Sequence, residues 1–283
     1  MHKQLIATWL FLFTLLAAAQ PSTEVFLFDI SDDLTLSNPV NVSANKGYDN
    51  QPSFTENGEL LYTSFRKGNT DLMKYDITSG KRIYLTETPA GEYSPTQMPS
   101  GESLSTITLE QNGRQLLWKY PLAKAGKGEE LVPFLKIGYH TWLNEDELFA
   151  FVLGPHPTLQ WIKLSTLRSE IIAEDIGRSL HIVPNTSLLS YVKKMDDQWV
   201  IRQYNPKTDA AVDLTTTQPE VEDMCWYDEN TLLMGKGSTL YSWTAGEGWK
   251  QVADLSDWEL TGITRMAVSR DQKKLAIVVN DPK

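Results

Sequence analysis

Short runs of alternating apolar and polar residues, separated by polar turns, recur along the chain. Between residues 51 and 89, three such runs lie between Asn-Gly, Lys-Gly-Asn and Thr-Ser-Gly sequences, which predicts a small antiparallel sheet. A sheet of this size cannot bury both of its faces alone. Neighbouring copies of the same unit are therefore expected to cover it.

The same order of apolar strand, polar turn and apolar strand returns at intervals of 43, 45, 40, 44 and 42 residues. The anchor positions of this repeat are Phe54, Gln97, Trp142, Ile182, Trp226 and Val268. A period near 43 with about four short strands per unit is typical of a β-propeller, in which each blade packs against two neighbours. Beyond the first twenty residues, no window indicates an amphipathic helix of twelve residues or more. We expect an all-β fold.

Only two strands follow the sixth anchor, near 264–268 and 275–279, so half a blade is missing at the end of the chain. The missing half is found near the beginning, where TEVFLFDI (23–30) matches TDLMKYDI (70–77) of the first unit in pattern. VNVS (40–43) matches IYLT (83–86) in the same way. The sequence therefore predicts a six-bladed β-propeller whose last blade is closed by the N-terminal strands.

The first nineteen residues have the layout of a secretory signal peptide. His2 and Lys3 precede an uncharged apolar run from Leu5 to Leu16, and three alanines follow up to Ala19. The apolar run is shorter than a membrane-spanning helix requires, and Gln20 stands where a lipoprotein would have Cys. We expect cleavage after Ala19, a periplasmic or secreted chain that is not a lipoprotein, and a single propeller domain over residues 20–283.

Charge and cysteine content narrow the classes of function. The chain carries a formal net charge of −10, and loss of Lys3 with the signal peptide makes it −11, so binding to nucleic acid is not expected. The lone cysteine, Cys225, cannot form an intrachain disulfide, and its apolar neighbours Met224 and Trp226 predict a buried, inert thiol.

The first repeat carries a family resemblance. QPSFTENGELLYTSFRKGNTDLMKYDITSGKRIYLT, followed by EYSPTQMPSG, resembles the WD40-like (PD40) repeat of TolB-type six-bladed propellers. The match is close over some 50 residues, and the later units keep only the spacing of strands and turns. The resemblance implies an envelope protein whose propeller contacts a protein partner. Similar propellers also occur beside serine peptidases and as lyases acting on pectic oligosaccharides, so an enzyme stays an alternative.

Motifs for catalysis or metal binding are weak. The sequence has no G-x-S-x-G nucleophile elbow and no D-x-D-x-D-G calcium loop. His140 and His181 occupy different positions in the repeat, and His156 lies in a Pro-flanked turn, which argues against a shared metal site. Most tryptophans, including Trp142 and Trp226 at anchor positions, are interpreted as packing residues. We predict no catalytic set, no metal and no cofactor.

The remaining candidate site is the mouth of the central channel, where residues just before each first strand converge from six blades. By repeat position these residues are Asp49, Asn50, Glu92, Tyr93, Tyr139, His140, Arg178, Glu222, Asp223 and Arg265. They form either a recognition surface or a polar rim that merely solvates the ring.

We favour a monomeric, non-enzymatic propeller that binds a protein or peptide of the cell envelope. The alternative is a lyase or hydrolase that processes a glycan or peptide at the channel mouth, with Glu92, Glu222 or Asp223 as acid and base. A purely structural module is the third possibility.

Overall fold

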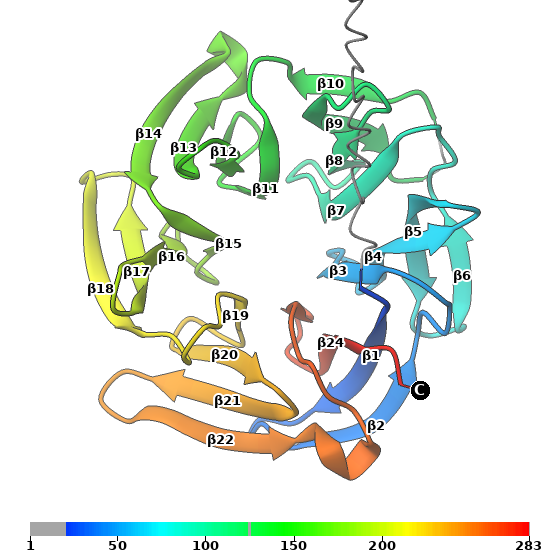
Figure 1. The fold of residues 1–283 in the computed structure, drawn as a ribbon, viewed down its shortest axis with the longest axis vertical. Helices are drawn as coiled ribbons and strands as arrows, with labels where there is room; N and C mark the ends of the chain where they lie inside the picture. Colours follow the sequence, from blue (N-terminus) through cyan, green and yellow to red (C-terminus); the bar gives the residue numbers. More distant parts are fainter. Residues whose placement is uncertain (1–20, 124–125, 283) are drawn as a thin grey trace, which may run out of the picture.

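Six four-stranded antiparallel sheets are arranged around a central axis (Figure 1). This computed structural model describes residues 21–123 and 126–282. The predicted signal peptide, residues 1–19, lies outside the described residues. The predicted six-bladed all-β propeller is confirmed.

Each of the first three blades is built from four consecutive strands, with the innermost strand first. Blade 1 contains β3 (Asp49–Phe54), β4 (Leu60–Arg66), β5 (Asn69–Asp76) and β6 (Lys81–Tyr84). Blade 2 contains β7 (Gly91–Gln97), β8 (Ser103–Leu109), β9 (Gln115–Pro121) and β10 (Glu129–Val132). Blade 3 contains β11 (Ile137–Trp142), β12 (Glu147–Val152), β13 (Thr158–Lys163) and β14 (Arg168–Glu174).

The second half of the ring repeats this order until the last blade. Blade 4 contains β15 (Ile176–Ile182), β16 (Leu189–Lys194), β17 (Trp199–Asn205) and β18 (Ala210–Thr216). Blade 5 contains β19 (Met224–Trp226), β20 (Thr231–Lys236), β21 (Thr239–Thr244) and β22 (Gly248–Asp254). Blade 6 contains β23 (Met266–Val268), β24 (Lys274–Asn280), β1 (Thr23–Ile30) and β2 (Leu36–Asn41).

Strands from both ends of the chain form blade 6, whose strand order is β2-β1-β24-β23. β1 pairs antiparallel with β24 without interruption, from Thr23 opposite Asn280 to Asp29 opposite Lys274. This pairing satisfies the backbone groups of both strands and removes an open sheet edge. The predicted closure by the N-terminal strands is confirmed.

The hydrophobic core lies between blades, because each sheet buries its faces against its neighbours. Between blades 6 and 1, Val25, Tyr62 and Val278 pack together and are fully buried. Between blades 3 and 4, Phe149 packs against Tyr204 with ring centroids 6.1 Å apart. The anchor tryptophans are buried as predicted. Each donates its indole N–H across a blade boundary at 2.8 Å, Trp142 to Ser105 and Trp226 to Ser190.

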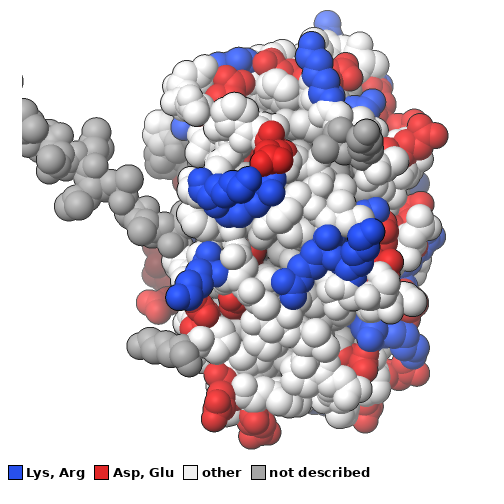
Figure 2. Space-filling model, turned by 90° about the vertical axis from the view of Figure 1, so that its right-hand side faces the viewer, with Lys and Arg blue, Asp and Glu red and all other residues white. Residues whose placement is uncertain are grey.

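Within the described residues, helix is limited to two short 3₁₀ turns, η1 (Leu164–Thr166) and η2 (Leu255–Trp258). None of the helices there is long and apolar enough to cross a membrane. On the side of the ring shown in Figure 2, basic and acidic side chains are interspersed among uncharged ones.

Candidate functional site

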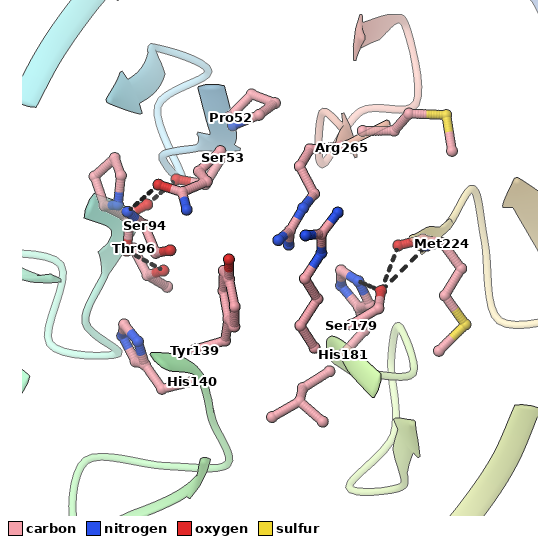
Figure 3. Close-up of a pocket in the computed structure, with 15 residues that line it drawn as sticks. Pro52, Ser53, Ser94, Thr96, Tyr139, His140, Ser179, His181, Met224 and Arg265 are labelled. Carbon is pink, nitrogen blue, oxygen red and sulfur yellow. Dashed lines mark hydrogen bonds between the residues drawn. The ribbon is translucent and has the colours of Figure 1, made fainter. Parts of the chain in front are cut away.

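A small cavity lies at the centre of the ring, where the innermost strands converge (Figure 3). Its volume is about 100 Å³. Every blade contributes to its lining, which includes Gln51 of β3, Ser94 of β7, Tyr139 and His140 of β11, Arg178 and His181 of β15, Met224 of β19, and Arg265 just before β23. The cavity therefore combines side chains that are far apart in the sequence.

Two of these arginines share one buried carboxylate. Asp223, which is 5% exposed, accepts hydrogen bonds from Arg178 Nε at 3.1 Å and Arg178 Nη2 at 2.7 Å. Arg265 Nε lies 2.9 Å from the same carboxylate. Arg178 comes from blade 4 and Arg265 from blade 6, while Asp223 directly precedes the innermost strand of blade 5. One carboxylate thus positions two guanidinium groups from different blades.

Electrostatic interactions within this cluster keep Asp223 and Arg178 charged. Burial alone would raise the pKa of Asp223, but the charge of Arg265 and the hydrogen bond and charge of Arg178 outweigh it and lower the pKa. Burial likewise disfavours the charged form of Arg178, yet Asp223 raises its pKa above the usual value. Asp223 is therefore an ion-pair partner at neutral pH and is poorly suited to act as a general acid.

Tyr139 and Glu222 complete the surroundings of the two arginines. The Arg265 guanidinium lies over the Tyr139 ring, 4.4 Å from its centroid. Glu222 accepts a hydrogen bond from the Arg178 backbone N–H at 3.1 Å and lies 2.9 Å from Lys194 Nζ. These contacts restrict the positions of both arginine side chains.

The two histidines of the cavity, His140 which is buried and His181 which is half-buried, are uncharged at neutral pH. His140 Nε2 lies 2.6 Å from Ser105 Oγ, and His181 Nε2 lies 3.1 Å from Ser179 Oγ. Burial lowers the pKa of His140 to about 3 and that of His181 to about 4. Although they occupy different repeat positions, both face the same cavity. They offer neutral hydrogen-bonding groups.

The other candidate groups for chemistry lie elsewhere. His156 is exposed, as its turn predicted, and its Nδ1 lies 2.8 Å from Asp175. Cys225 is buried, and burial raises the pKa of its thiol to about 12, which agrees with the predicted inert role. In the part of the chain that the structure describes, no three His, Cys, Asp or Glu side chains are grouped to hold a metal ion.

Of the predicted mouth residues, Tyr139, His140, Arg178 and Arg265 line the cavity, and Glu222 and Asp223 contact its arginines. The remaining four, Asp49, Asn50, Glu92 and Tyr93, are not part of the lining. Asp49 and Asn50 face the boundary between blades 6 and 1, where Asn50 Nδ2 lies 3.3 Å from Thr23 Oγ1. Tyr93 packs edge-on against Tyr48.

Asp49 and Glu92 are instead fully buried carboxyl groups at two successive blade boundaries. Asn45 links Asp49 to Glu24 of β1, because its side chain donates to Asp49 at 3.3 Å and its backbone N–H donates to Glu24 at 3.2 Å. Glu92 accepts a hydrogen bond from Thr88 Oγ1. Burial raises the pKa of Asp49 and of Glu92 to about 7. We call these two positions the acidic boundaries.

Sequence reasoning missed Gln51, Ser94, Ser179, His181 and Met224 as lining residues. They lie one to three positions before the anchors, inside the first strands and not before them. Gln51 and Ser94 have positive φ angles, 57° and 53°, at irregularities in the pairing of β3 and β7. Such bulges redirect side chains. Taking the residues one to three positions before each anchor would have identified these positions. The sequence gave no signal for the bulges, which decide that the side chains of Gln51 and Ser94 face the cavity.

Comparisons with known proteins agree on the fold. No protein-family model matches the sequence, and no curated protein matches it. Among solved structures, the protein assigned as TolB in Agrobacterium tumefaciens has a TM-score of 0.71 at 11% identity, with 93% of this chain and 100% of that chain covered.

Two further solved structures extend the comparison. TolB from Acinetobacter baumannii has a TM-score of 0.62 at 11% identity, and the match covers 93% of this chain but 64% of that one. An oligogalacturonate lyase in complex with manganese has a TM-score of 0.58 at 13% identity, with 90% and 82% covered. The chain therefore has the six-bladed β-propeller fold of TolB-like proteins, a fold that it shares with enzymes.

Proposed function

We propose that this chain is an exported, non-enzymatic propeller that binds a protein or peptide partner of the cell envelope at the mouth of its central channel. The observation that carries the proposal is the pair of arginines, Arg178 and Arg265, fixed by Asp223 at the edge of the cavity. Arg and Tyr are among the residues enriched at protein-binding hot spots, and Arg265 lies over the Tyr139 ring. Export follows from the pattern of residues 1–19, and we propose one domain over 20–283 acting as a monomer.

The geometry favours binding over acid-base catalysis by the predicted carboxylates. Glu92 lies at an acidic boundary and not in the lining, while Glu222 and Asp223 are engaged by Arg178, Arg265 and Lys194. A general acid needs a proton to give at the working pH and must reach the substrate. None of the three carboxylates combines these properties.

The test is capture of envelope proteins on the immobilised chain, with wild type compared with Arg265→Lys and Tyr139→Ala. Arg265→Lys keeps a positive charge near Asp223 but removes the planar fork of donors, so partner recovery should fall at least tenfold while the chain stays folded. Arg202→Lys is the matched control, because Arg202 is a surface arginine paired with Asp213. Equal recovery by all variants would rule out the cavity as the binding site.

Export is tested separately by the intact mass of the chain recovered outside the cytoplasm. The expected mass is that of a chain beginning at Gln20, and a mass that includes Met1 would contradict the proposal.

A further inference from the structure

We infer that the cavity is a site for one carboxylate group carried by a peptide. The inference rests on the proposed function, because it assigns the chemistry that a peptide partner presents to the channel. Three observations support it: which guanidinium atoms Asp223 occupies, the balance of charge at the cavity, and the size of the cavity.

Asp223 engages only part of each guanidinium. A guanidinium has five N–H donors in a fixed fork. Asp223 takes the Nε and Nη2 atoms of Arg178 and the Nε atom of Arg265. Donors on the terminal nitrogens of both arginines therefore remain for a ligand, and both side chains line the cavity. The two terminal nitrogens of one guanidinium match the spacing of two carboxylate oxygens.

The charges beside the cavity favour an anion. The cluster contains three cations, Arg178, Arg265 and Lys194, and two anions, Glu222 and Asp223. The histidines of the lining add no charge, because burial holds their pKa values near 3 and 4. The cluster therefore has one more positive than negative charge, in a chain whose formal net charge is −10. Both arginines line the cavity, and Lys194 contacts Glu222 outside the lining. Because the arginines are partly buried, their attraction for an anion is stronger than that of the same groups in bulk water.

The cavity is fixed in position before any ligand arrives. Tyr139 lies beneath Arg265, and the backbone and side chain of Arg178 are both held by neighbouring carboxylates. Because these side chains are already ordered, a ligand would not have to bear the entropy cost of ordering them. The site therefore has the preorganisation expected of a specific subsite.

The size of the cavity restricts the ligand. About 100 Å³ is smaller than an engineered protein cavity of about 150 Å³ that binds benzene. Pockets that enclose drug-sized ligands have about 300–1,000 Å³. A carboxylate with one or two further atoms fits this space. Met224 and Met266 add apolar surface beside the arginines, as required for the carbon that bears the carboxylate.

Two positions on a peptide can supply this carboxylate, the chain end and an acidic side chain. Direct titration of the ¹⁵N-labelled chain distinguishes them, with the arginine Nε–H resonances as the signal. The probes are acetyl-Gly-Gly as free acid, acetyl-Gly-Gly amide, acetyl-Glu amide and galacturonate. We expect the free acid to shift the Arg178 and Arg265 signals and the amide to bind at least tenfold more weakly.

The outcomes separate the possibilities. If acetyl-Glu amide binds more tightly than acetyl-Gly-Gly, the carboxylate site holds and its source is a side chain. If galacturonate binds more tightly than both peptides, the peptide assignment is wrong. If acid and amide bind equally, or if no carboxylate binds at millimolar concentration, the inference is overturned.

Variants provide the second measurement. Arg265→Lys should weaken binding of acetyl-Gly-Gly at least tenfold, and the control Arg202→Lys should leave it unchanged. The comparison of acid with amide uses wild type alone, so the test does not depend on the variant folding. Loss of envelope-protein capture in Arg265→Lys without carboxylate binding by wild type would contradict this inference and leave the proposed function standing. Carboxylate binding by wild type without any captured partner would support this inference and contradict the proposed function.

Discussion

The pKa values of buried carboxyl groups shift in opposite directions at the two acidic boundaries and in the arginine cluster, which consists of Arg178, Arg265 and Asp223. Asp49, Glu92 and Asp223 are all at most 5% exposed, and all belong to or directly precede innermost strands. Burial raises the pKa of Asp49 and Glu92 to about 7, whereas the pKa of Asp223 is lowered by Arg265 and Arg178 in spite of its burial. The difference shows that burial alone does not decide the charge of a carboxyl group. A cation in direct contact does.

The two regions also differ in how closely they follow the repeat. At the acidic boundaries, equivalent hydroxyls have equivalent partners: Ser43 accepts from the Val25 N–H at 2.8 Å, and Thr86 accepts from the Leu72 N–H at 2.9 Å. Glu24 and Asp71 likewise occupy matching positions in β1 and β5. Blades 4 to 6 have Arg178, Asp223 and Arg265 at the inner end instead. We call the acidic boundaries and the blade closure beside them the regular part of the ring. The cluster of Arg178, Asp223 and Arg265 is the irregular part, and it provides the charged groups at the cavity.

The largest effect is expected from breaking the regular part at its closure. A chain that begins at Tyr48 lacks β1 and β2, so β24 keeps β23 but loses its other partner, and the faces of blades 5 and 1 lose part of their cover. Such a chain should lose most of its cooperative unfolding transition. Circular dichroism during heating measures this. Unfolding near the midpoint of the full chain would show that the closure contributes little.

The second effect concerns the ion pairs of the irregular part. Asp223→Ala leaves Arg178 and Arg265 partly buried without their shared carboxylate, which should lower the free energy of unfolding by about 3–5 kcal/mol. Urea unfolding at pH 7 measures the loss. The control Asp213→Ala removes an exposed partner of Arg202 and should cost at most about 1 kcal/mol. Equal losses in the two variants would mean that the buried cluster is no stronger than a surface pair.

The third prediction uses pH to distinguish the two regions. The folded-state pKa values of Asp49 and Glu92, about 7, exceed the values of about 4 expected in the unfolded chain. Between about pH 4 and pH 7, the folded chain therefore binds more protons at these groups than the unfolded chain does. The stability contributed by these groups is fully present below about pH 4 and is lost as the pH rises through about 7. The double variant Asp49→Asn with Glu92→Gln has no carboxyl group to titrate at these two positions. Its free energy of unfolding should therefore fall less than that of wild type between pH 5 and pH 8.

Urea unfolding at the two pH values measures the difference. Asp76→Asn is the control, because hydrogen bonds from Ser79 lower the pKa of Asp76 and place its contribution below about pH 4. The control should keep the pH dependence of wild type. A double variant as pH-dependent as wild type would contradict the assignment of these boundaries.

The smallest effect is expected from Glu222→Gln. Glu222 is more exposed than Asp223, and the amide oxygen of Gln can still accept from the Arg178 backbone N–H. The variant should lose about 1 kcal/mol, mainly from the contact with Lys194. Thermal and urea unfolding of Glu222→Gln and Asp223→Ala under the same conditions rank the two losses of stability. A loss equal to that of Asp223→Ala would mean that the two carboxylates share the arginines equally.

Local chemistry was sufficient to predict much of this molecule. The spacing of the anchors from Phe54 to Val268 determined the number of blades, because each strand alternates with a turn whose residues favour specific backbone angles. The match of TEVFLFDI to TDLMKYDI determined the closure, and the apolar neighbours of Cys225 determined its burial. These features depend on residues close together in the sequence or on exact repetition.

Only the tertiary structure decided which side chains share the cavity. Arg178, Asp223 and Arg265 are separated by more than forty residues from one to the next, so no local pattern shows that one carboxylate contacts both arginines. Bulges at Gln51 and Ser94 turn those residues to the lining, while Asp49 and Glu92, a few positions earlier, face blade boundaries. A repeat fixes the place of a strand around the ring. The direction of a side chain at its inner end depends on backbone irregularities and on partners supplied by other blades.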